Sequence, residues 1–288
     1  MPELHLRGLS DHDARSLLES VLVTPLDHRV LERVVAEACG NPMALLELPL
    51  SARSAHLAGG FELPAVIDVP RRVEESFRQR STELPADTRL LILVAAAEPT
   101  GDAELFWRAA SHAGIAADAV GPAEDAGLLE VGTSVRFRHP LVRSAIYRSA
   151  SPPDRRRAHA LLAAVTDPTI DPDRRAWHRA RAVLGRDEDA AADLERSAGR
   201  ARSRGGLAAS AAFMGHAARL TPDPAMRAAR ALDAAFAANE SGASEAASQL
   251  LTLAKRDRST RIRAHAWICC VRAWHSRTRG LARAWRSC

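Results

Sequence analysis

The 288-residue chain is short of several residue types, and each shortage excludes a class of protein. Of its four cysteines, Cys39 stands alone and the other three lie beyond residue 268. This distribution excludes a disulfide-stabilised scaffold and favours a reducing, cytoplasmic compartment. No apolar run approaches the ~20 residues of a membrane-spanning helix. The N-terminus lacks the apolar core of a secretory signal.

Lysine is almost absent, which bears on the phosphate-binding loop of P-loop ATPases. A phosphate-binding loop, Gly-x-x-x-x-Gly-Lys-Ser/Thr, uses backbone N–H groups and a lysine to hold the phosphates. Lys255 is the only lysine, and no glycine stands near it. No Gly-x-Ser-x-Gly or His-Glu-x-x-His motif occurs either. We therefore expect that this protein is not an enzyme and holds no metal ion.

The net positive charge of the chain comes from its last 34 residues. Residues 255–288 hold ten Lys and Arg residues and one Asp, a formal charge of +9, so residues 1–254 carry −4 of the total +5. The body of the chain is therefore mildly acidic. Its charge gives no support for a surface that binds duplex DNA.

Few aromatic residues and many Ala and Leu residues favour a mainly α protein. Turn and helix signals divide the chain into five parts. We expect a helical N-terminal region over 1–62, a connecting helix over 63–84, a winged-helix domain over 85–150, tetratricopeptide-like helical repeats over 151–254, and a basic Trp- and Cys-rich tail over 255–288.

The winged-helix expectation depends on the order of the predicted elements. Helical patterns over 86–98, 102–114 and 116–127 precede two short strands that flank Gly132-Thr133, and a helix over 140–147 follows.

The prediction of helical repeats depends on regular breaks between helical segments. Helical segments after residue 154 are interrupted near residues 167–172, 185, 205–206, 222–224 and 242, and Ser210, Ala217 and Pro222 have the spacing of a tetratricopeptide helix.

Two motifs carry a family resemblance. Residues 37–49 read EACGNPMALLELP, where Gly40, Asn41 and Pro42 separate two helical stretches, and residues 135–147 read VRFRHPLVRSAIY. Together they resemble the large ATP-binding regulators of the LuxR family, which are signal-transducing P-loop ATPases with several domains. The stretches AAAEPTGDAELFWRAA and DPDRRAWHRA also resemble that family, without a known chemistry. The resemblance covers residues 1–254.

The resemblance implies roles for four residues. In such regulators a Gly-x-Pro motif lies in a helical lid whose proline packs on the nucleotide base, which implies that Gly40, Asn41 and Pro42 belong to a lid. A histidine at the start of a winged-helix helix reaches the β-phosphate of ADP, and His139 matches it. A ring N–H can donate to a phosphate oxygen.

The missing parts limit this interpretation. Without a phosphate-binding loop, and without a C-terminal helix-turn-helix, we interpret the chain as a middle fragment of such a regulator. The full-length family binds ATP or ADP, whereas we expect no cofactor in this fragment. Its helical repeats would bind a protein partner or a small inducer.

Two alternative functions remain, and the tail has several interpretations. The repeats would serve a plain protein-interaction scaffold equally well. A winged helix can also bind DNA, but its third predicted helix carries Asp118, Glu124 and Asp125 and no basic residue. For the tail, zinc binding by its Cys and His residues and adhesion to RNA or acidic membranes are open readings. We prefer an out-of-frame translation, which would explain its sudden Arg, Trp and Cys content.

Overall fold

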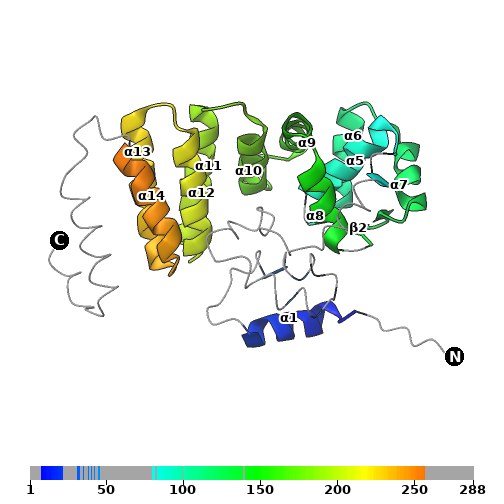
Figure 1. The fold of residues 1–288 in the computed structure, drawn as a ribbon, viewed down its shortest axis with the longest axis horizontal. Coiled ribbons are helices and arrows are strands. Elements are labelled where there is room, and N and C mark those ends of the chain that lie inside the picture. Colours follow the sequence, from blue (N-terminus) through cyan, green and yellow to red (C-terminus); the bar gives the residue numbers. More distant parts are fainter. Residues whose placement is uncertain are drawn as a thin grey trace. The chain divides into compact units, whose positions relative to one another are not determined.

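The protein is described by a computed structural model, which places residues 8–21, 31–32, 35, 38, 40, 42, 45, 80–81, 83–98, 100–138 and 140–256. The chain divides into two compact units, Met1–Val183 and Leu184–Cys288. The described residues are mainly helical and contain one two-stranded antiparallel sheet (Figure 1). This confirms the mainly α prediction. Most of the expected connecting helix and nearly all of the expected tail lie outside the described residues.

The first described helix, α1 (Asp11–Val21), lies in the region that was expected to be helical. The Ser10 hydroxyl accepts a hydrogen bond from the Asp13 backbone N–H at 3.2 Å and donates one to the Asp13 carboxylate at 2.7 Å. This reciprocal pair supplies a partner for one of the helix's free N–H groups. Leu31, Val35 and Ala38 are helical and buried.

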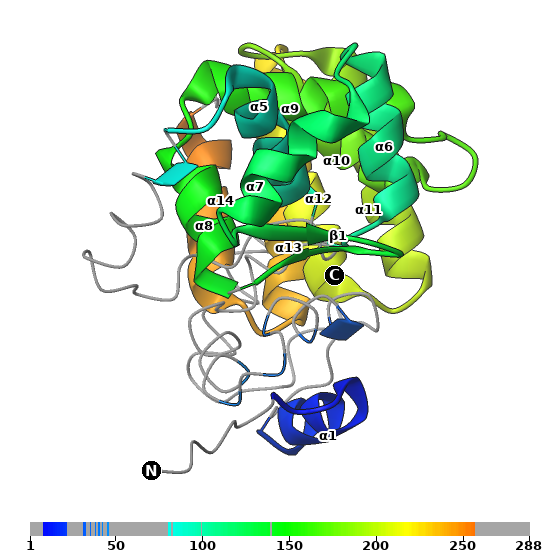
Figure 2. The ribbon, with the colours of Figure 1, turned by 90° about the vertical axis from the view of Figure 1, so that its right-hand side faces the viewer.

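Helices and a hairpin follow in the predicted order. The elements are α5 (Ala86–Ala97), α6 (Ala103–His112), the 3-10 helix η2 (Ala117–Val120), α7 (Gly121–Asp125), β1 (Leu129–Val131), β2 (Val135–Phe137) and α8 (Pro140–Ser149). The third predicted helix is thus split into η2 and the five-residue α7. Strands β1 and β2 pair as predicted, with Val131 opposite Val135, and lie beside α7 and α8 (Figure 2).

The hairpin is also tied to the segment that precedes α6. The Val135 N–H donates to the Gly101 carbonyl at 2.9 Å, and Asp102 forms an isolated antiparallel bridge with Ser134. Gly101 has φ +70°, and a Cβ there would lie 2.5 Å from the Val135 carbonyl oxygen. Only glycine permits this backbone and this close approach, so residue 101 fixes where the hairpin meets the α5–α6 connection.

The core of unit 1 is built around α5, which is apolar on nearly all sides and buried from Leu90 to Ala97. Helix α9 (Pro152–Val165) packs against α5 and α6, and α10 (Pro172–Ala182) packs against α9. The expected start of the repeats at residue 151 stays a prediction, and the compact unit continues to Val183. The apolar surface of α5 explains this, because it needs α9 as a cover.

Unit 2 is a series of antiparallel helices, in which each packs against the next: α11 (Glu188–Ser203), α12 (Leu207–Leu220), α13 (Pro224–Glu240) and α14 (Ser244–Arg256). Asp187 and Asp223 cap α11 and α13 by accepting backbone N–H bonds. The predicted breaks at 205–206 and 242 fall between helices, and the break at 222–224 ends at Pro224, the first residue of α13. Alanine dominates the α12–α13–α14 interfaces, which allows close helix approach. None of the helices in the described ranges combines the length and apolarity that a membrane crossing requires.

Candidate functional site

The residues that the family resemblance singled out are only partly described. Gly40 lies in a turn with φ +72°, and Pro42 is helical and exposed. Asn41 and His139 lie outside the described residues. The backbone at Gly40 agrees with the predicted helix end, because a left-handed glycine commonly terminates a helix. Whether Pro42 and His139 face a common ligand stays a prediction.

Gly40 has a structural reason that needs no nucleotide. The Leu9 backbone N–H donates to the Gly40 carbonyl at 2.8 Å. A Cβ on residue 40 would lie 2.5 Å from the Leu9 carbonyl oxygen. The tight approach of these two backbone segments therefore requires glycine whether or not a ligand binds nearby.

Arg143, in the motif around His139, links two helices. This side chain is buried, and its Nε donates to the carbonyl of Ala96 at 2.9 Å. Ala96 lies in the last turn of α5, where helix carbonyls lack intrahelical partners and the helix dipole favours a cation. Arg143 thus fastens α8 to the end of α5.

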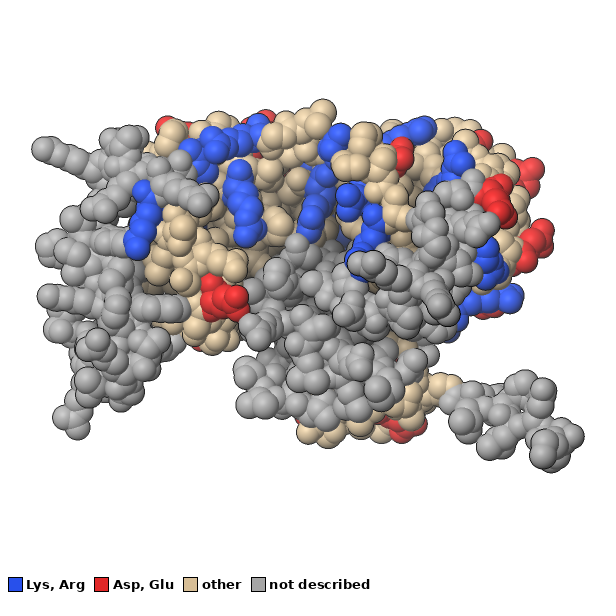
Figure 3. All heavy atoms as spheres, viewed as in Figure 1, with Lys and Arg blue, Asp and Glu red and all other residues tan. Residues whose placement is uncertain are grey.

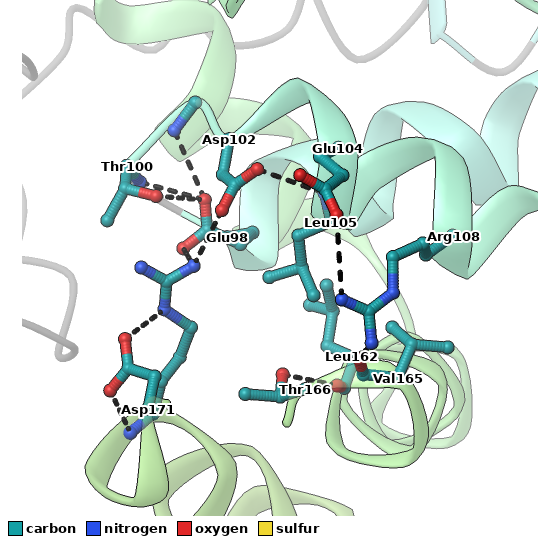
Figure 4. Close-up of polar contacts among 12 residues, drawn as sticks. Glu98, Thr100, Asp102, Glu104, Leu105, Arg108, Leu162, Val165, Thr166 and Asp171 are labelled. Carbon is teal, nitrogen blue, oxygen red and sulfur yellow. Dashed lines mark hydrogen bonds and ion pairs between the residues drawn. The ribbon is translucent and has the colours of Figure 1, made fainter. Parts of the chain in front are cut away.

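A polar cluster joins the two sequence stretches to which no chemistry was assigned. Glu98 Oε2 accepts hydrogen bonds from the Thr100 N–H at 2.9 Å, the Thr100 hydroxyl at 2.8 Å and the Gly101 N–H at 3.1 Å (Figure 4). The Glu98 side chain is only 4% exposed. It organises the α5–α6 connection, and we call Glu98, Asp102, Asp171 and Arg174 the Glu98 cluster.

Arg174 on α10 is the cation of this cluster. Its Nη1 lies 3.2 Å from Asp102 Oδ2 and 3.9 Å from Glu98 Oε1, and its Nε lies 3.0 Å from Asp171 Oδ2. Three carboxylates, those of Glu98, Asp102 and Asp171, thus surround one guanidinium group (Figure 4). Asp102 and Asp171 also cap α6 and α10. One arginine therefore couples the starts of two helices to the loop that supports the hairpin.

A second buried chain of polar groups joins three helices. The Tyr147 hydroxyl lies 2.7 Å from His159 Nε2, and His159 Nδ1 lies 2.8 Å from His178 Nδ1. These residues belong to α8, α9 and α10, and both histidines are buried. Facing Nδ1 atoms share one proton, so the tautomers of the two rings are coupled. Burial, and to a smaller extent the charges of Arg181 and Arg155, lower the pKa of His159 to about 3.

The stability of unit 1 is expected to depend on pH through His159. An unfolded chain binds a proton near the ordinary pKa of 6.5, whereas the folded imidazole stays neutral down to about 3. Stability is therefore complete above pH 6.5 and falls as the pH drops between 6.5 and 3, by about 2 kcal/mol at pH 5. Urea unfolding of the chain between pH 4 and 8 measures this slope.

The matched variants for this prediction are His159→Gln and His112→Gln. His112 is exposed at the end of α6 and lies outside the buried histidine chain, so His112→Gln is the control for replacing a histidine as such. His159→Gln should remove about one proton from the slope between pH 4 and 6. Equal slopes in the wild type and His159→Gln would refute the assignment.

Unit 2 contains a groove of about 590 Å³ between α11, α12 and α13. Its lining mixes apolar and charged side chains: Ala198, Gly199, Met214, Phe236 and Ala237, with Glu195, Arg202, Ser210, Asp233 and Glu240. Arg202 pairs with Glu240 at 3.0 Å. The groove has the size and mixed lining of a ligand pocket, and it is the candidate binding site of this unit.

A buried arginine stabilises the helices that form the groove. Arg230 on α13 donates to both carboxylate oxygens of Glu188 at 2.7 and 3.0 Å. It donates to Glu195 Oε2 from Nε at 2.9 Å and from Nη2 at 2.7 Å, and to the Thr221 hydroxyl at 2.7 Å. All five guanidinium N–H groups thus have an acceptor. The hydrogen bonds that Arg230 donates to Glu188 foremost, opposed by burial, raise the pKa of Arg230.

The sequence did not single out this arginine or the groove. Arg230 is one of many arginines in the chain, and its carboxylate partners lie 35 and 42 residues away. Its position in the interior of α13 gives no local signal.

Within the described ranges, no group of three or more His, Cys, Asp and Glu residues is arranged to hold a metal ion. The tail cysteines lie outside those ranges.

The Glu98 cluster, the histidine chain, the Arg230 network and the groove are thus four polar arrangements among the described residues. Comparison of the chain with family models, with curated proteins and with solved structures found no match.

Proposed function

We propose that the chain is a non-catalytic regulatory module of the LuxR-type ATP-binding class, in which unit 2 binds a partner and unit 1 corresponds to the lid and winged helix. The order of elements is the observation that carries this proposal. Helices α5 and α6, the short elements η2 and α7, an antiparallel hairpin and the helix α8 precede a run of packed helices. The family resemblance implies the same order of elements.

Details of the hairpin support the winged-helix part of the proposal. The bridge between Asp102 and Ser134 places the segment before α6 alongside the hairpin, as a third, minimal strand. Helix α8 packs against both α5 and β2. A small domain whose hairpin is held in this way by the α5–α6 connection is typical of a winged helix.

The geometry argues against direct reading of DNA by this domain. A recognition helix needs several exposed side chains on one face to contact base edges in the major groove. Helix α7 has five residues, and Ala123 is buried. Asp118 and Asp125 are exposed there, and acidic side chains gather at the α7 end of the unit (Figure 3). Phosphates would be repelled from this edge.

The scaffold alternative shares the same binding unit. A plain scaffold needs only the stacked helices of unit 2, and the groove between α11, α12 and α13 suits it as well. The two functions differ in their output. A regulatory module changes transcription when it binds its partner, whereas a scaffold only assembles proteins.

The regulatory proposal is tested by transcript profiling. Inducing the full chain in the organism that encodes it should change the messenger RNA levels of a limited set of genes by about twofold or more, because a partner taken up by unit 2 is withdrawn from its regulatory circuit. A strain with the empty vector is the control. If the protein accumulates in folded form and no transcript changes, the regulatory proposal is wrong and the scaffold alternative is favoured.

A further inference from the structure

We propose that the groove of unit 2 binds a peptide segment of a partner protein, with an arginine or lysine side chain against Asp233 and an apolar side chain between Met214 and Phe236. This inference rests on the proposed function, because it names what the sensing unit takes up. It is argued from the lining of the groove, its charges and its volume.

Asp233 is the carboxylate of the groove that lacks an internal partner. Glu195 is already held by Arg230, and Glu240 is paired with Arg202. Among the described residues, none forms a hydrogen bond or an ion pair with Asp233, which is exposed at the groove. Partial burial and the charge of Glu195 raise the pKa of Asp233, and Arg202 opposes this in part. A cation from outside would relieve that repulsion.

The apolar lining decides what accompanies the cation. Met214 and Phe236 are half-buried in the groove, and Ala198 and Ala237 lie at its buried base. Thioether and aromatic side chains with one open face bind apolar groups well and adapt to their shape. An arginine or lysine stem and a neighbouring apolar residue would cover them, while the charged head reaches the carboxylate.

Charge and size exclude other classes of occupant. Three carboxylates and one arginine line the groove, so a nucleotide or another anion would meet net negative charge. A simple inorganic cation would leave the apolar lining exposed to water. A volume of about 590 Å³ suits two or three residues of an extended peptide. The mixed lining therefore fits a basic and apolar peptide segment.

The probes are four fluorescein-labelled hexapeptide pools with randomised apolar flanking positions and Arg, Lys, Gln or Glu at one central position. Fluorescence anisotropy with the full chain measures their dissociation constants at low and moderate salt. We expect the Arg and Lys pools to bind about fivefold more tightly than the Gln pool, with a difference that shrinks as salt rises. The Glu pool should bind most weakly.

The test variant is Asp233→Asn, and Glu245→Gln is its matched control. Glu245 is exposed in the first turn of α14, outside the groove lining, so its replacement removes an equal charge from the same unit. Asp233→Asn should abolish the preference for the basic pools, whereas Glu245→Gln should preserve it. Both substitutions lie at exposed positions and are expected to leave the fold intact.

Two results would overturn this inference. One is equal binding of the basic and neutral pools, or a preference that survives Asp233→Asn. The other is concentration-dependent self-association that Asp233→Asn abolishes, since the occupant would then be a second copy of the chain. Either result leaves the transcript experiment unaffected, so a failure of the groove assignment is distinguishable from a failure of the regulatory proposal.

Discussion

Replacing Arg230 with methionine is expected to destabilise unit 2 by about 2–3 kcal/mol, because it removes the cation on which two glutamates converge. The loss should be smaller than for a fully buried pair, since Glu188 and Glu195 are 42% and 45% exposed and regain water. Methionine preserves most of the side-chain volume. Denaturant unfolding followed by circular dichroism measures the change.

The control for this prediction is Arg196→Met, on the outer face of α11. Arg196 pairs with Asp193 three residues away and is 62% exposed. An exposed pair of this kind contributes little, about 0.5 kcal/mol or less. Arg230→Lys should resemble the methionine variant, because one ammonium group cannot reach both carboxylates and Thr221. Wild-type stability in Arg230→Met would show that the ion network is dispensable.

Local signals in the sequence predicted most of the helices of the second unit. Gly205, Gly242 and the Pro222–Pro224 segment interrupt helical periodicity, and the structure ends or begins helices at each. Such breaks are encoded within a few residues, because a glycine with positive φ or a proline without an N–H acts on its own backbone. The hairpin was predictable from another local signal, the two short strands that flank Gly132 and Thr133.

Long-range pairing was not predictable in this way. The extent of unit 1 depends on the packing of α9 against α5 and α6, so residues 152–182 joined the first unit although their helical pattern is that of a repeat. The split of the third helix into η2 and α7 also escaped prediction. Pro122 stands at the start of α7 and suits a helix N-terminus. The prediction of a single helix over 116–127 did not take this signal into account.

The groove of unit 2 was not predicted from the sequence, and the ligand contacts implied for Gly40, Asn41, Pro42 and His139 stay predictions. Gly40 has the backbone that its motif implied, and Pro42 is exposed. The groove residues come from three helices, and their chemistry appears only when the helices stack. Helical periodicity does mark Glu195 and Asp233 as surface positions beside an apolar stripe. It cannot say which surface positions of different helices face one another.

Removing the Glu98 side chain, as in Glu98→Ala, is expected to destabilise unit 1 by about 2–4 kcal/mol. The variant leaves the N–H groups of Thr100 and Gly101 without their acceptor and leaves Arg174 with two carboxylates in place of three. Glu104→Ala is the control, because Glu104 is 85% exposed and pairs weakly with Arg108. Its effect should stay below about 0.5 kcal/mol. Thermal and urea unfolding of both variants measure the difference.

The same variant separates two contributions to the cluster. If Glu98 acts mainly through the α5–α6 loop, Glu98→Ala and Arg174→Met should have additive effects on the free energy of unfolding. If the ion pair at 3.9 Å matters, the double variant should lose less than the sum, with a coupling of about 0.5–1 kcal/mol. The distance exceeds that of a hydrogen bond, and Arg174 is nearer to Asp102 and Asp171. We therefore expect nearly additive effects, because Glu98 stabilises the unit mainly through the α5–α6 loop. A coupling energy well above about 1 kcal/mol would show instead that the ion pair between Glu98 and Arg174 contributes more than the loop.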